Sequence, residues 1–199
     1  MQHLLASRLI NRTSCLACAA LALSSAATAS VQSLVVNGDF ESGSISPWTL
    51  DGPSGSLVLG SLGAFSGDTG LFYFEAQTGP NGSMTAALQG IAANASLLLQ
   101  FDFASIGTAG TLSVGQMAPF IGFLNDLPTI SMQPGSSNQL TRYSYAFSAV
   151  DGLEGIAFHW NALPGGVIAI DNVSITVVPA PGAVALLGMA GLAGSRRRR

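Results

Sequence analysis

The sequence predicts an all-β fold, an antiparallel β-sandwich, flanked by an N-terminal signal peptide and a short C-terminal transmembrane helix. Three observations favour this architecture. Apolar and polar residues alternate with a period of two in several short segments, which is typical of half-buried strands. The 24 glycines and 9 prolines of the 199 residues separate such segments at short intervals. Long apolar runs occur only near the two ends, and the length suits one domain.

The alternation is clearest in three segments, residues 97–103, 141–147 and 155–161. In the last of them, Phe158 and Trp160 share the face that we expect to point inward, because the two-residue period separates apolar from polar side chains. Further strands are expected at residues 34–36, 57–59, 71–76, 84–88, 112–114, 129–132 and 167–177.

One segment, residues 86–99, competes as a helix by its apolar spacing. Gly90 and the turn-forming Asn94-Ala95-Ser96 weaken that alternative, because glycine and short polar residues interrupt helices. About ten short strands joined by glycine-rich turns are then left, and these predict an antiparallel sandwich over residues 30–177.

The N-terminal segment, residues 1–29, has the three parts of a secretory signal peptide. Arg8 and Arg12 come first, an apolar run follows at 15–23, and small residues end at Ala29, where we expect signal peptidase to cut. The alternative is a membrane anchor, but this run is much shorter than the roughly 20 residues that span a bilayer. Both cysteines of the chain lie before the cut, so the exported chain would hold no disulfide and no thiolate metal site.

The C-terminal segment, residues 178–199, also has three parts. Its elements, in order, are the motif Val178, Pro179, Ala180 and Pro181, the small and apolar residues 182–194, and the cluster Arg196, Arg197, Arg198 and Arg199. The apolar part is short for a spanning helix, but arginine side chains extend such a helix by snorkelling and hold its end on the cytoplasmic side. A plain C-terminal anchor is the simple alternative.

This tail resembles the PEP-CTERM sorting signal of Gram-negative bacteria, which a membrane protease called exosortase recognises. Ala180 stands where that family most often has Glu. The resemblance implies an exported protein with signal peptidase and an exosortase-type protease as processing partners. It also implies anchoring in the inner membrane before processing, and then a place in the cell envelope, on the outer surface or outside the cell.

The charge distribution excludes one class of partner. All ten acidic residues lie between Arg12 and Arg196, where Arg142 is the only basic residue, and the chain has no lysine. A segment this acidic cannot bind nucleic acid, or an anionic membrane surface, through a basic patch.

Two motifs in the middle region carry a second resemblance. Residues 36–43, Val-Asn-Gly-Asp-Phe-Glu-Ser-Gly, are followed by Pro47-Trp48, and residues 170–175 read Ile-Asp-Asn-Val-Ser-Ile. This pairing resembles carbohydrate-binding modules with a galactose-binding-like jelly roll. The resemblance implies a structural Ca²⁺ held by Glu41 and Asp171, with backbone carbonyls near Asn37 and at 66–67 as further ligands. In the alternative interpretation these residues are solvated turn formers.

Such modules bind sugars through aromatic rings and planar polar groups on one exposed face, and the resemblance implies the same here. The candidate ligand-binding residues are Trp48, Tyr73, Gln100, Asp102, His159, Trp160 and Asn161. Most of the other aromatic residues are expected in the core.

Catalysis has little support in the sequence. His159 is the only histidine after the predicted signal peptide, and neither a multi-histidine zinc site nor a G-x-S-x-G motif is present. We therefore predict an exported, non-catalytic protein of the cell envelope or extracellular matrix, associated with exopolysaccharide. The alternatives are a specific carbohydrate-binding module and a small polysaccharide hydrolase, since two carboxylates suffice for glycoside hydrolysis.

Overall fold

The computed structural model describes residues 32–51, 58–60, 65–67 and 70–179. These residues form strands and turns, and none of them lies in a helix. The predicted signal peptide, residues 1–29, lies outside the described residues. The same holds for the end of the C-terminal motif (Ala180 and Pro181), the predicted transmembrane helix and the arginine cluster.

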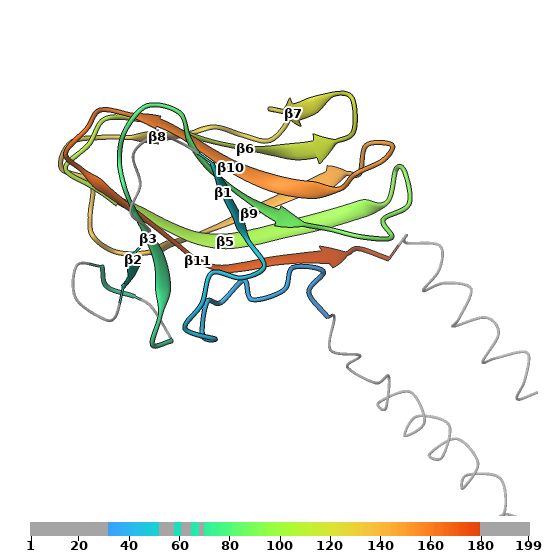
Figure 1. Cartoon of the computed structure of the whole chain (residues 1–199), viewed down its shortest axis with the longest axis horizontal. Coiled ribbons are helices and arrows are strands. Elements are labelled where there is room, and N and C mark those ends of the chain that lie inside the picture. The colour runs from blue at the N-terminus through green and yellow to red at the C-terminus, as the bar shows by residue number, and fades with distance from the viewer. Residues whose placement is uncertain (1–31, 52–57, 61–64, 68–69, 180–199) are drawn as a thin grey trace, which may run out of the picture. The chain divides into compact units, whose positions relative to one another are not determined.

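The described residues contain eleven strands, which form two sheets that face each other (Figure 1). Sheet A contains, in order across the sheet, β1 (Thr49–Asp51), β4 (Gly82–Ala87), β10 (Gly155–Ala162) and β6 (Gly110–Ala118), with β7 (Gly122–Leu124) and β8 (Ile130–Met132) both paired to the outer edge of β6. Sheet B contains, in order, β2 (Val58–Gly60), β3 (Tyr73–Gln77), β11 (Val167–Val177), β5 (Ser96–Ile106) and β9 (Thr141–Ser148).

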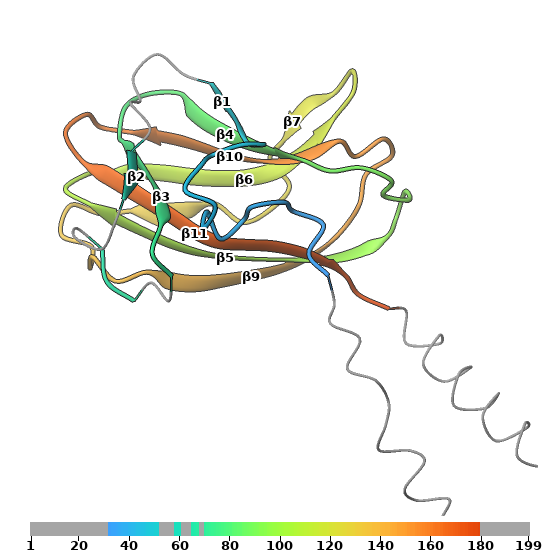
Figure 2. The same cartoon turned by 60° about the horizontal axis from the view of Figure 1, so that its bottom comes forward.

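Every pair of neighbouring strands is antiparallel, and the chain passes repeatedly from one sheet to the other (Figure 2). For example, β10 of sheet A is followed by β11 of sheet B, and β5 of sheet B by β6 of sheet A. The predicted β-sandwich is therefore confirmed.

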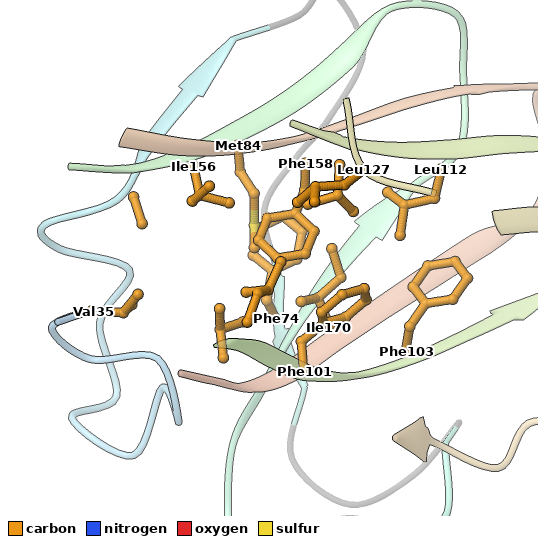
Figure 3. Packing of buried hydrophobic residues seen from close by; sticks show 14 of the residues in the cluster. Val35, Phe74, Met84, Phe101, Phe103, Leu112, Leu127, Ile156, Phe158 and Ile170 are labelled. Carbon is orange, nitrogen blue, oxygen red and sulfur yellow. The ribbon is translucent and has the colours of Figure 1, made fainter. Parts of the chain in front are cut away.

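The core forms where the inward faces of the two sheets meet. Figure 3 shows Ile156 and Phe158 of β10 pointing toward Phe101 and Phe103 of β5. The rings of Phe101 and Phe158 pack edge to face with centroids 5.0 Å apart, an arrangement that aromatic pairs prefer. The two-residue period of both strands produces this contact, because it places every second side chain between the sheets.

The prediction of a strand at residues 34–36 is wrong, since this segment forms bends. It nevertheless lies along the last strand, because the amide of Leu34 donates to the carbonyl of Ile175 at 2.7 Å. The competing helix at 86–99 is also absent. Residues 88–95 connect β4 to β5 by an irregular segment with a bend at Gly90 and a turn at 93–94, and Gly90 and Asn94 have φ of 69° and 61°, values that end regular secondary structure.

The outward faces of the two sheets differ. On sheet B, Phe65, Tyr73 and Leu140 form a second buried cluster with two alanines of β5 and β11. The segment 65–67 is fastened over this cluster by backbone hydrogen bonds, from Ser66 to Asn138 at 2.9 Å and from Leu140 to Ser66 at 2.8 Å. Sheet A carries no such buried cluster on the outer side of its described strands. The outward face of the central strands of sheet A therefore has no such cover, and the outward face of sheet B over β9 is exposed as well.

Candidate functional site

The structure separates the predicted ligand-binding residues into three groups. Trp48, Tyr73 and Trp160 form the first group, and all three are buried. The indole of Trp48 packs against Phe40 and donates to the carbonyl of Asn37 at 3.0 Å, and that of Trp160 lies against Gly82 in the core. These positions correct the expectation of an exposed stacking platform, because buried rings present no face to a sugar.

Gln100 and Asp102 form the second group, on the outer face of sheet B. The carboxylate of Asp102 accepts two hydrogen bonds from the guanidinium of Arg142, at 2.5 and 3.0 Å, and one from the amide of Asn172 at 3.0 Å. Asp102 is only 7% exposed, so its carboxylate has lost most of its hydration, and the ion pair supplies hydrogen bonds in place of water. Both oxygens of the Asp102 carboxylate therefore have hydrogen-bond donors within the domain, which gives Asp102 a structural role.

His159 and Asn161 form the third group, on the outer face of sheet A. They alternate along β10 with the inward Phe158 and Trp160. In the sheet register, His159 lies opposite Ser83 of β4 on one side and Ser113 of β6 on the other.

Other small polar residues surround this pair. We call the outward set the sheet A face; its members are Ser83, Thr85, Thr111, Ser113, Phe123, His159 and Asn161. Among the described residues, the only hydrogen bond between side chains of this set and its surroundings joins the hydroxyls of Ser113 and Thr129, at 3.4 Å. The remaining hydroxyl, amide and imidazole groups are available to a ligand.

Phe123 is a member of this face that the sequence analysis missed. It lies on β7, opposite Met117 of β6, and its ring centroid is 6.0 Å from that of His159. The β6–β7 hairpin rises from the edge of sheet A on the side away from sheet B (Figures 1 and 2). Two half-buried rings thus lie next to a row of hydroxyl groups.

A glycine allows the hairpin to take this position. A Cβ at Gly115 would collide with the carbonyl of Leu124 and with the ring of Phe123. The base of the hairpin is fixed by Gln116, a buried side chain whose amide donates to Asp126 and to the carbonyl of Ser148 at 3.1 Å. The arrangement of Phe123 over sheet A therefore depends on backbone contacts and a satisfied polar network.

The sheet A face presents neutral polar groups beside two rings. It offers hydroxyl groups, one amide, one imidazole and one apolar ring, which match the hydroxyl groups and C–H surfaces of a sugar. Among the described residues His159 makes no hydrogen bond with a carboxylate, so no nucleophile–base–acid arrangement is centred on it. No group of three or more metal-ligating residues occurs in the described part of the chain.

The two end motifs of the domain meet at the opposite sheet. The amide of Val173 donates to the carbonyl of Gly38 at 2.7 Å, and a Cβ at Gly38 would collide with the Val173 carbonyl. The meeting point on β11 is a bulge after Asp171, where Asn172 has a φ of 50°. The first motif therefore packs directly on the last strand.

Glu41 and Asp171 belong to the two motifs that meet at this contact. The Glu41 carboxylate accepts the amides of Leu71, at 2.7 Å, and Phe72, at 3.0 Å, which lead into β3. Asp171 follows Ile170, the last residue of β11 that pairs with β3, and is 1% exposed. Two carboxylates at one end of neighbouring strands are an oxygen donor set of the kind that Ca²⁺ uses.

The described part of the C-terminal motif is exposed. The amide of Val178 donates to the carbonyl of Ser96 at 2.8 Å, which extends the last strand by one contact, and Pro179 follows without secondary structure. No helix long and apolar enough to cross a membrane occurs among the described residues, and the predicted helix lies beyond them.

The fold resembles that of carbohydrate-binding modules. TmCBM61, solved with β-1,4-galactotriose, matches with a TM-score of 0.53 and 14% identity, over 74% of this chain and 99% of that chain. The K1 cleaved adhesin domain of Lys-gingipain from Porphyromonas gingivalis matches with a TM-score of 0.55 and 16% identity, over 71% of this chain and 96% of that chain.

A larger protein shares the same fold in part. The enzymatically active domain of tailspike protein 4 from bacteriophage CBA120 matches with a TM-score of 0.55 and 18% identity, over 73% of this chain but 21% of that chain. No protein-family model and no curated protein sequence matches the chain. At these identities the likeness shows the fold: a jelly-roll β-sandwich of the kind found in carbohydrate-binding modules.

Proposed function

We propose that this protein is a non-catalytic carbohydrate-binding protein and that the sheet A face holds the glycan. The observation that carries the proposal is the pairing of two rings, Phe123 and His159, with neighbouring hydroxyl and amide groups on the outer face of sheet A. Sugars combine C–H surfaces, which contact rings, with hydroxyl groups, which pair with planar or hydroxylic side chains.

The fold supports the same function. Jelly-roll sandwiches of this shape include TmCBM61, whose structure was solved with β-1,4-galactotriose. A flat sheet with few side-chain contacts of its own needs little rearrangement to bind, which limits the entropy lost on association. The oligosaccharide would lie across β4, β10 and β6, with Phe123 at one side.

The test is calorimetric titration of the purified protein with a panel of neutral oligosaccharides that includes β-1,4-galactotriose. For an oligosaccharide that binds, Phe123→Ala and Asn161→Ala should each weaken affinity about two- to tenfold, the value of one aromatic contact or one hydrogen bond. Gln100→Ala, on the outer face of sheet B, is the matched control and should leave affinity unchanged.

Three results would contradict the proposal. Binding that is lost in Gln100→Ala and retained in Phe123→Ala would move the site to sheet B. The absence of binding across the whole panel would remove the carbohydrate function. Shortening of the oligosaccharide during incubation would show catalysis and favour the hydrolase alternative.

We further propose that the protein is exported and that its C-terminal tail acts as a PEP-CTERM-like sorting signal, so that binding takes place in the cell envelope or extracellular matrix. The order of the proline motif, apolar segment and arginine cluster supports this proposal. Cell fractionation with and without the exosortase tests it. Retention of the tail and of the same location in both strains would leave a plain anchor as the explanation.

Finally, we propose that Glu41 and Asp171 hold a structural Ca²⁺. The buried carboxylate of Asp171 accepts a hydrogen bond from the side-chain amide of Asn172 at 2.9 Å, a cation would balance its charge, and both residues supply oxygen ligands. The ion would fasten the first motif to β11 and would take no part in glycan binding. Chelation should lower the melting temperature, whereas an unchanged midpoint would remove the ion from the account.

A further inference from the structure

From the charges around the sheet A face we infer that it selects uncharged glycans and rejects uronic-acid or sulfated ones, and that Asp51 contributes to the rejection. This inference rests on the proposed carbohydrate function and names the class of its ligand. Many extracellular polysaccharides are polyanions, so this selectivity would decide which of them the protein binds.

The first observation is the absence of any cation that could pair with an acidic sugar. The strands of sheet A contain no lysine and no arginine. The whole sequence between residues 13 and 195 contains one, Arg142. Its guanidinium lies on the outer face of sheet B and makes two hydrogen bonds with Asp102, so it is committed elsewhere.

The second observation is the position of Asp51. It ends β1, the edge strand, and lies opposite Ser83 in the register. Its neighbour Leu50 packs against the core, so the alternation of the strand turns Asp51 outward, to the side of the sheet A face. Asp51 is exposed and has no ion pair among the described residues. It therefore adds a negative charge at the margin of the face.

The magnitude follows from the strand spacing. Neighbouring strands lie about 4.8 Å apart, so a ligand over β4 and β10 is within about 5–10 Å of Asp51. At that range a carboxylate on the ligand is repelled enough to weaken binding about two- to fivefold at low salt, and less at high salt. The acidic residues elsewhere in the domain add to this repulsion over longer distances.

The experiment uses matched ligands. The probe is a neutral oligosaccharide that binds, for instance β-1,4-galactotriose, and its partner is the same oligosaccharide oxidised at C6 to the uronic acid. The neutral form should bind with the same affinity at low and high salt. The oxidised form should bind at least severalfold more weakly, and the difference should shrink as salt rises.

Asp51→Asn then tests the named residue. It should raise affinity for the oxidised form about two- to fivefold and leave the neutral form unchanged. Asp39→Asn, in the exposed turn of the first motif against sheet B, removes the same charge away from the sheet A face and should change either affinity much less than Asp51→Asn does.

The outcomes separate this inference from the function on which it rests. If the neutral oligosaccharides bind and the oxidised form binds equally well or better, with or without added Ca²⁺, the selectivity is overturned and the carbohydrate function stands. If Asp51→Asn instead weakens the neutral form, Asp51 is a ligand-binding residue and its role in rejection is overturned. If no neutral oligosaccharide binds, the proposed function fails and the inference fails with it.

Discussion

Replacing Gly115 with alanine tests how the β6–β7 hairpin is held over sheet A. Gly115 lies on β6 and its missing side chain leaves room for the carbonyl of Leu124 and the ring of Phe123. Its φ is not in the left-handed region, so an alanine there adds a collision without backbone strain. To admit one methyl group, the end of β7 has to move away from β6.

The expected destabilisation can be worked out from the contacts at risk. Three residue pairs join β7 to β6, ending at Gln116 and Leu124. Inserting a methyl group into a tight contact costs about 1–3 kcal/mol, which equals the loss of one to three net backbone hydrogen bonds. For a domain of this size that lowers the melting temperature by about 3–10 °C. Because Phe123 moves with β7, glycan affinity should fall by the same two- to tenfold as in Phe123→Ala.

Scanning calorimetry and the calorimetric titration measure these two effects on one sample. Gly90→Ala is the matched control: its Cβ meets nothing within 4 Å, but its φ is 69°. It should destabilise by about 1 kcal/mol through backbone strain and leave glycan affinity unchanged. A Gly115→Ala protein that melts and binds like the unaltered chain would refute the role given to this glycine and the position given to Phe123.

Three further predictions concern stability. In urea unfolding, Arg142→Ala should lower the free energy of unfolding by about 1–3 kcal/mol, because it leaves the buried carboxylate of Asp102 without its cation. The double variant with Asp102→Asn should recover part of this loss, because it removes the unpaired charge. Phe158→Ala should cost about 3–5 kcal/mol in the same assay, since this ring is fully buried between the sheets. Burial and the nearby Tyr143 raise the pKa of the Tyr145 hydroxyl. The stability that this hydroxyl contributes is therefore complete below about pH 10 and is lost as the pH rises through the pKa of the folded state. Tyr145→Phe should flatten this alkaline decline in melting temperature.

The sequence predicted the long strands well because their pattern is set by burial alone. The expected strand at 167–177 has the bounds of β11, and the segments 97–103, 141–147 and 155–161 all lie within observed strands. The alternation of inward and outward residues is enough to predict such strands, without knowledge of the adjoining turns or of the strands with which they pair.

Two short strands were missed for the opposite reason. β1 and β7 have three residues each, too few to show a period. They exist because of their partners: β1 pairs with β4, and β7 is folded back on β6 by the tight turn before Gly122, whose φ is 74°. Long-range pairing of this kind leaves little trace in the local sequence.

The site was predictable in part. The period that turned Phe158 inward also turned His159 and Asn161 outward, and the structure places both on the exposed side. The same period places Trp160 inside, so its choice as a ligand-binding residue conflicted with the strand pattern and burial decided against it. Phe123 carried no local signal, because its position depends on a glycine eight residues earlier in the chain.

The arrangement of the two sheets makes the separate proposals independent of one another. The first and last motifs, which contain Glu41 and Asp171, meet on β11 of sheet B, whereas the rings and hydroxyl groups lie on the outer side of sheet A. A cation at the first location would stabilise the fold without contacting a ligand at the second. We therefore expect a chelator to lower the melting temperature while the protein that remains folded keeps its affinity for a neutral oligosaccharide. If the chelator lowers the affinity and leaves the melting temperature unchanged, the cation belongs to the glycan site, and the division of roles between the two sheets is wrong.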